Sequence, residues 1–168
     1  MQIMSIETIP VIIETPKGSR EKYHYDEKSR IISLKKLLPQ GMVFPFDFGF
    51  VPGTKAPDGD PLDILLLSEF ATFPGCQQEC RLIGGFKALQ SETKSKDKKI
   101  RNDRIFAIPV LSEVFNHIET WNDFPEKVMN ETEQFFIQYN KLEGKSFEIL
   151  EKIKPKEALR LVKKSYIK

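Results

Sequence analysis

The sequence predicts a mainly β domain of the α+β class, in which short strands close into a barrel and two helices follow late in the chain. Three observations support this. Short runs rich in Ile, Val and Tyr alternate with turn-forming segments, the middle of the chain continues the series, and helical periodicity appears only in the last third. No fixed repeat or Pro/Gly/Ser linker divides the 168 residues, so we expect one domain, 1–168.

The expected strands are taken in chain order. The first three lie at 10–14, 22–26 and 30–34, separated by the turn-like segments KGSR and DEKS. Three more are expected at 64–67, 80–89 and 104–110, where apolar and β-branched residues gather again.

Two helices are expected after the strands. The first begins near Pro125 and ends at Gly144, with a buried face formed by Val128, Thr132, Phe135, Phe136, Tyr139 and Leu142. The second begins at Pro155 and turns Ala158, Leu161 and Val162 inward, while its basic residues face water.

Composition excludes several classes of protein. The net charge of +2 is too small to indicate nucleic-acid binding by itself, and no apolar run reaches the roughly 20 residues of a membrane helix. The N-terminus lacks a basic stretch followed by an apolar one, so we expect a cytoplasmic protein. Cys76 and Cys80 have no second Cys or His pair, which favours free thiols over a zinc site.

The segment KAPDGDPLDILLL gathers Asp58, Asp60 and Asp63 just before an apolar run. On a straight strand Asp63 would point away from the other two, but Gly59 and Pro61 allow a bend that brings the carboxylates together. Hard oxygen ligands of this kind favour magnesium. A turn with Asx-type hydrogen bonds explains the same spacing, and the residues alone leave both interpretations open.

The segment DGDPLDILL resembles the signature of family I soluble inorganic pyrophosphatases. The similarity extends from Val11 to about Lys145 and includes VIIETPKG, EKYHYDEKS, MVFPFDFGFVPGT, RIFAIPV and FFIQYNKLEGK. The resemblance implies an OB-like five-stranded closed barrel with flanking C-terminal helices. It also implies magnesium-dependent hydrolysis of pyrophosphate to two phosphates, with Mn²⁺ or another divalent metal as an alternative, and a homo-oligomer, commonly a hexamer.

The resemblance also implies roles for individual residues. Asp58, Asp60 and Asp63 would bind the metal, Asp60 would also orient or deprotonate the attacking water, and Glu14 would join the metal-binding set at the rim. Contacts to phosphate oxygens would come from Lys22, Lys36, Arg104 and Tyr139.

Several positions depart from the family's pattern. His24 stands in place of a glutamate, Lys36 in place of an arginine and Arg104 in place of a lysine. Phenylalanines 44 and 48 replace tyrosines, Ser91 and Asn102 replace a carboxylate pair, and Asn140 replaces a lysine. The intervening loop, which contains TKSKDKKIR, is longer. We therefore expect at least one weakened metal site, unless Glu92, Asp97 or Asp103 compensates.

Two other functions remain as alternatives. The chain could bind metal and phosphate compounds without efficient pyrophosphate hydrolysis, or cleave another phosphoanhydride. A nucleic-acid-binding barrel would use the basic loop from Lys94 to Arg101, but that run is more simply a solvated loop, so we expect neither a nucleic-acid nor a membrane partner.

Smaller expectations concern histidines and phenylalanines. His24 is either a metal or phosphate contact or a half-exposed strand residue, and His117 is structural. The phenylalanines of FPFDFGF form barrel core and one wall of the cleft, because so many rings are costly to leave in water.

Overall fold

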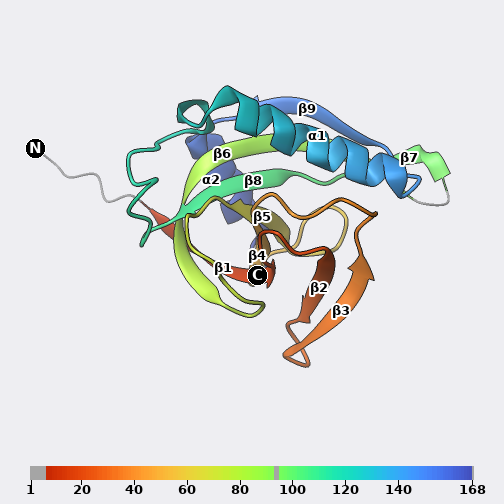
Figure 1. The fold of residues 1–168 in the computed structure, drawn as a ribbon, viewed down its shortest axis with the longest axis horizontal. Coiled ribbons are helices and arrows are strands. Elements are labelled where there is room, and N and C mark those ends of the chain that lie inside the picture. The colour runs from red at the N-terminus through yellow and green to blue at the C-terminus, as the bar shows by residue number, and fades with distance from the viewer. Residues whose placement is uncertain (1–6, 93–94, 168) are drawn as a thin grey trace, which may run out of the picture.

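The structure is a computed structural model that describes residues 7–92 and 95–167 (Figure 1). Its helices are α1 (Glu126–Leu142) and α2 (Pro155–Ser165), with a short 3₁₀ helix η1 (Trp121–Asp123). Its strands are β1 (Thr8–Thr15), β2 (Glu21–Asp26), β3 (Ile31–Leu37), β4 (Asp47–Val51), β5 (Leu62–Leu66), β6 (Gln77–Glu92), β7 (Ser95–Arg101), β8 (Arg104–Pro109) and β9 (Phe147–Ile153).

Five strands form a closed ring. Their order is β1, β4, β5, β8 and β6, and β6 pairs back with β1, so the ring has no free edge. The β5–β8 pair is parallel, with Ile64 opposite Ile105, and the other pairs in the ring are antiparallel. The expected five-stranded closed barrel is confirmed.

Alternate residues of the ring strands pack into two separate hydrophobic cores. On β5, Leu62, Ile64 and Leu66 join residues of β1 and the inner face of α2. Leu65 and Leu67 point the other way, into a cluster of phenylalanines covered by α1. The alternation explains why β5 is apolar at nearly every position, since both of its faces are buried.

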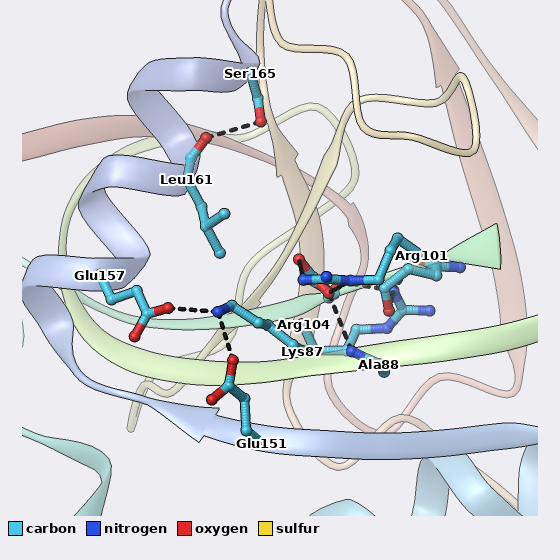
Figure 2. Close-up of polar contacts among 10 residues, drawn as sticks. Lys87, Ala88, Arg101, Arg104, Glu151, Glu157, Leu161 and Ser165 are labelled. Atoms are coloured by element: carbon cyan, nitrogen blue, oxygen red, sulfur yellow. Dashed lines mark hydrogen bonds and ion pairs between the residues drawn. The ribbon is translucent and has the colours of Figure 1, made fainter.

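Other elements attach to the ring through β6, the longest strand. β6 extends beyond the ring and pairs with β7 and β9, and α1 crosses beside β9 (Figure 1). Lys87 on β6 contacts Glu151 on β9 and Glu157 on α2, and these ion pairs tie both elements to the strand (Figure 2). The β2–β3 hairpin is a separate two-stranded sheet that projects from the ring (Figure 1).

Three strands were not expected from the sequence. β4 is buried at all five positions, so it lacks alternation, and β9 has four exposed or charged positions typical of surface segments. The segment Ser95–Arg101, expected as part of a solvated loop, is strand β7 paired with β6, whereas Lys94 lies outside the described residues. The expectation of a loop at 95–101 is therefore wrong, because backbone pairing to β6 outweighs the polar composition.

The helices agree with the expected positions, with one exception. α1 begins one residue after Pro125 and α2 begins at Pro155, where proline suits the first turn. Leu142, expected on the buried face of α1, is 64% exposed because the helix has by then passed the edge of the core.

The phenylalanines behave as expected for a core. Phe44, Phe46, Phe48 and Phe50 are all at most 7% exposed. Both cysteines are free thiols, and Cys80 is buried. His117 is exposed in the turn before η1. Within the described part of the chain, no helix is long and apolar enough to cross a membrane.

Glu69 holds the loop that follows β8. Its carboxylate accepts hydrogen bonds from Ser112 Oγ at 2.7 Å and from the backbone N–H groups of Glu113 at 2.8 Å and Val114 at 3.2 Å. Partial desolvation raises the pKa of Glu69, but these bonds together lower it to about 2.

We expect Glu69→Gln to change how stability depends on pH. The pKa of Glu69 is lower in the folded state than its ordinary value of 4.5, so its stabilising contribution is complete above that value and is lost as the pH falls toward 2. In urea unfolding, the variant should therefore have a lower free energy of unfolding than wild type at neutral pH, and the difference between the two proteins should become smaller in acid. Glu113→Gln removes a neighbouring exposed carboxylate as a control, and parallel curves for Glu69→Gln and wild type would contradict the assignment.

Candidate functional site

One open cleft of about 190 Å³ collects most of the charged side chains that the sequence singled out. A volume of this kind is roomy for a small polyatomic anion with water, since a single water needs only about 10–15 Å³. The cleft is lined by the carboxylates of Glu14, Asp58, Asp60, Asp63 and Glu143 and by the cations Lys22, Lys35, Lys36, Arg104 and Lys145. Side chains of opposite charge therefore line the same open space.

The three aspartates come from a turn and the strand after it. Gly59 adopts a φ of +92°, which a side chain would disfavour, and the turn brings the N–H of Asp60 to 3.2 Å from Oδ1 of Asp58. This is the Asx-type bond of the structural interpretation. The same turn also places Asp58 and Asp60 in one cleft with Asp63 of β5, as a metal site requires.

The pKa values of Asp58 and Asp63 are raised above their ordinary range, first by desolvation and then by neighbouring carboxylates. Desolvation raises the pKa of Asp58, and the charges of Asp63 and Asp60 raise it further. Burial also raises the pKa of Asp63, although Arg104 and Lys22 oppose that shift. Among residues 7–92 and 95–167, however, no three Asp, Glu, His or Cys side chains are close enough to hold a metal ion as they stand.

Asp63 and Arg104 form a nearly buried ion pair. Arg104 Nη1 lies 2.7 Å from Asp63 Oδ2, and the Arg104 side chain is 6% exposed. The two residues immediately precede Ile64 and Ile105, which are opposite each other in the parallel β5–β8 pair. The register of the barrel therefore puts the cation beside the carboxylate.

Lys22 of β2 reaches into the cleft over an aromatic ring. Its Nζ lies 5.0 Å from the centroid of Phe48, within the range of a cation–π contact. Desolvation of the ammonium group lowers the pKa of Lys22 to about 8, while the charge of Asp63 opposes this shift and that of Arg104 adds to it. Phe48 and Phe50 line the cleft, whereas Phe44 lies in the core behind it.

Glu14 and His24 meet at one side of the cleft. His24 Nδ1 lies 3.0 Å from Glu14 Oε1, and the N–H of Tyr25 donates to the same oxygen at 2.8 Å. Burial raises the pKa of Glu14, with the Tyr25 hydrogen bond opposing it. The His24 side chain is 40% exposed, so it is both a half-exposed strand residue and a cleft residue in contact with a carboxylate.

Lys36 and Tyr139 lie together at the end of α1. Lys36 Nζ lies 4.9 Å from the centroid of the Tyr139 ring and forms an ion pair with Glu143. The hydroxyl of Tyr139 is buried, with no hydrogen-bond partner among the described residues. Burial raises the pKa of this hydroxyl, although Lys36 opposes the shift.

The uncharged residues at the altered positions bond to the protein itself. Ser91 is buried, and its hydroxyl accepts from the N–H of Ser146 at 2.8 Å. Asn140 Nδ2 donates to the carbonyl of Phe136 at 2.8 Å within α1. Asn102 lines the cleft, but its amide bridges Gln90 and Arg104.

The nearby carboxylates do not replace the lost ones. Asp103 accepts from the N–H of Ala88 at 3.0 Å and pairs with Nε and Nη2 of Arg101 at 2.9 Å each. Figure 2 labels both partners, Ala88 and Arg101. Asp97 is exposed on β7, and Glu92 pairs with Lys98 at 3.2 Å. A one-residue shift that would bring Asp103 into the cleft is therefore absent from this part of the structure.

Some cleft residues were missed in the sequence. Lys145 and Glu143 reach the cleft because α1 ends beside it, and Gln90 and Lys35 reach it from β6 and β3. A cation just after the Gly144 turn of a helix that already carries Tyr139 was a usable signal for Lys145. No comparable signal marked Gln90, whose position depends on the pairing of β6.

Comparisons with known proteins place the chain in one family. The family model described as inorganic pyrophosphatase matches residues 11–168. The inorganic pyrophosphatase of Methanosarcina acetivorans is 42% identical over 135 residues, which cover 80% of this chain and 76% of that one. That of Haloferax volcanii is 37% identical over 145 residues, which cover 86% and 78%.

Solved structures support the same assignment. The crystal structure of inorganic pyrophosphatase from Thermus thermophilus matches with a TM-score of 0.86 at 32% identity, covering 97% of this chain and 91% of that one. The ring of five strands, the cleft and the shared sequence all lead to one conclusion: the chain belongs to the family I soluble inorganic pyrophosphatases.

Proposed function

We propose that this protein is a metal-dependent inorganic pyrophosphatase that hydrolyses pyrophosphate to two phosphates. The observation that carries the proposal is the cleft itself, in which aspartates and cations face one another within one small space. Pyrophosphate needs both, because cations must hold its charged oxygens while carboxylates bind metal and accept a proton. Family membership supports the same reaction.

The donors in the cleft fit a hard divalent cation, for which we propose Mg²⁺, with Mn²⁺ as an alternative. Asp58, Asp60 and Asp63 would hold it, with Glu14 at the rim, and all four offer the oxygen atoms that such ions prefer. The raised pKa values of Asp58 and Asp63 support this choice, because a cation relieves their crowding. When bound, the cation would polarise the phosphoryl group and make a water molecule more acidic.

Asp60 is the proposed general base. It is exposed in the turn, so its carboxylate can reach a water molecule in the cleft and accept a proton from it. The oxygen of that water forms a new bond to one phosphorus atom, and the bridging oxygen leaves with the second phosphate. Asp58 lies beside Asp60 and keeps the turn in place through its hydrogen bond.

The cations would bind the phosphate groups. Lys22 and Arg104 line the cleft from β2 and β8, and Lys36 and Tyr139 line it from β3 and α1. The buried hydroxyl of Tyr139 has an unused donor for a phosphate oxygen. Lys145 would supply a positive charge near Asn140, the position that lacks one.

Binding without efficient turnover is the second candidate function. It is favoured by one observation, namely that Ser91, Asn102 and Asn140 direct their side chains to bonds within the protein. A nucleic-acid partner is not proposed, because Lys98, Lys99 and Arg101 each pair with a carboxylate.

We further propose a homo-oligomer in the cytoplasm. Ile31, Leu34 and Leu37 of β3 are each more than half exposed, and a second copy of the chain would cover such a surface. The two free thiols suit a reducing compartment.

The proposed function predicts phosphate release from pyrophosphate by the pure protein with Mg²⁺ or Mn²⁺. Asp60→Asn should lower the turnover number by about 100-fold or more, because the amide cannot accept the proton. Asp97→Asn is the matched control, since Asp97 is exposed on β7, and its activity should equal that of wild type. A colorimetric phosphate assay measures all three proteins.

Two results would count against the proposal. Equal activity in Asp60→Asn and wild type would point to a contaminating enzyme. If wild type releases no phosphate with either metal but calorimetry detects pyrophosphate binding, the second candidate replaces the first.

Phe48→Tyr should raise pyrophosphate turnover. Phe48 lies under Lys22 and Arg104, so a hydroxyl there would add a donor near the bound phosphates, which we expect to raise kcat/KM by about 10-fold. Phe44→Tyr adds the same hydroxyl in the core behind the cleft, where it should lower stability by about 1–3 kcal/mol without a gain in rate. An unchanged rate for Phe48→Tyr would show that a missing hydroxyl does not limit the reaction.

A further inference from the structure

Arg104 is held as a fixed positive charge inside the cleft wall. Its guanidinium carbon lies 5.1 Å from the ring centroid of Phe136, 5.4 Å from that of Phe147 and 5.7 Å from that of Phe48. The residue is 5% exposed. Three aromatic rings leave the flat guanidinium little room to turn away, and ring faces favour a cation.

A pair of amides orients this guanidinium. Asn102 Nδ2 donates to Gln90 Oε1 at 2.7 Å, which turns Asn102 Oδ1 toward Arg104, and this oxygen accepts from Arg104 Nη1. The carbonyl of Asp103 accepts from the same nitrogen at 2.9 Å. Gln90 therefore acts on Arg104 through Asn102, and among the described residues its side chain makes no hydrogen bond to the three aspartates or to the guanidinium.

The oriented guanidinium forms an ion pair with the carboxylate of Asp63. Nη1 lies 2.7 Å from Asp63 Oδ2, so the most buried of the three aspartates already has a positive partner before any metal arrives. The wall on the Arg104 side adds the uncharged side chains of Gln90 and Asn102. A divalent cation that approaches Asp63 would meet the repulsion of a charge that the fold keeps in place.

We propose that Arg104 is a built-in counter-ion of Asp63 that competes with divalent metal for this carboxylate, and that Gln90 and Asn102 are the positioning residues that hold it there. This inference rests on the proposed function, since it requires a divalent cation to bind the cleft. It assigns a function to Asn102, which otherwise appears as a lost ligand, and to Gln90, which the sequence did not single out. In the absence of substrate, metal binding is then weaker than three aspartates would give alone.

The test measures Mn²⁺ binding without substrate, by electron paramagnetic resonance of the free ion. Arg104→Gln removes the charge and should lower the Mn²⁺ dissociation constant by about 10-fold or more, because Asp63 is released to the metal. Arg101→Gln removes the same charge from β7, where the partner is Asp103, and should change the constant by less than about 2-fold. Gln90→Ala, which leaves every charge in place, should tighten Mn²⁺ binding partway, because Arg104 is then less well held.

Each outcome of this test supports or overturns the inference about Arg104. If Arg104→Gln retains the wild-type circular dichroism spectrum and binds Mn²⁺ no more tightly, the inference is overturned. If that variant does not fold, Gln90→Ala decides, and an unchanged constant there overturns the inference. Wild type that binds no Mn²⁺ and releases no phosphate would instead overturn the proposed function, so the two failures are distinguishable.

Discussion

The ion pair between Asp63 and Arg104 is the interaction on which the site depends. Both residues stand where a strand begins, and the parallel pairing of β5 with β8 fixes their separation. Taking both charges out of water is costly, but removing one partner alone commonly costs about 3–5 kcal/mol because the other is left unpaired. The same contact therefore links β5 to β8 and sets the charge in this wall of the cleft.

The surroundings of this pair account for the uncharged residues in the cleft wall. With Arg104 next to it, position 102 is occupied by an amide that accepts from the guanidinium and donates to Gln90. Ser91, the residue after Gln90 on β6, joins this strand to the segment after α1 through Ser146. Ser91 and Asn102, which look like missing metal ligands in the sequence, thus form hydrogen bonds within the protein. The bond of Ser91 supports β6, and that of Asn102 supports the guanidinium of Arg104.

Much of the fold was predictable because its signals are local. Runs such as VIIE and DILLL predicted β1 and β5, and the spacing of apolar residues predicted both helices. β4 and β9 were missed because one is buried on both faces and the other is a charged outer strand. In the site, the aspartates and most cations were found from a short motif. The pairing of Asp63 with Arg104, and of Glu14 with His24, depends on which strands become neighbours, and no local pattern specifies that.

The closing of the ring through β6 has a consequence for how the chain folds. β1 pairs with β4 on one side and with β6 on the other, and Thr8 lies opposite Arg81, far along the chain. Contacts between such distant segments cost loop entropy before they return any stabilisation, so proteins rich in them fold slowly. The seam between β1 and β6 is then expected to form late, and until it does both strand edges stay open to pairing with other molecules.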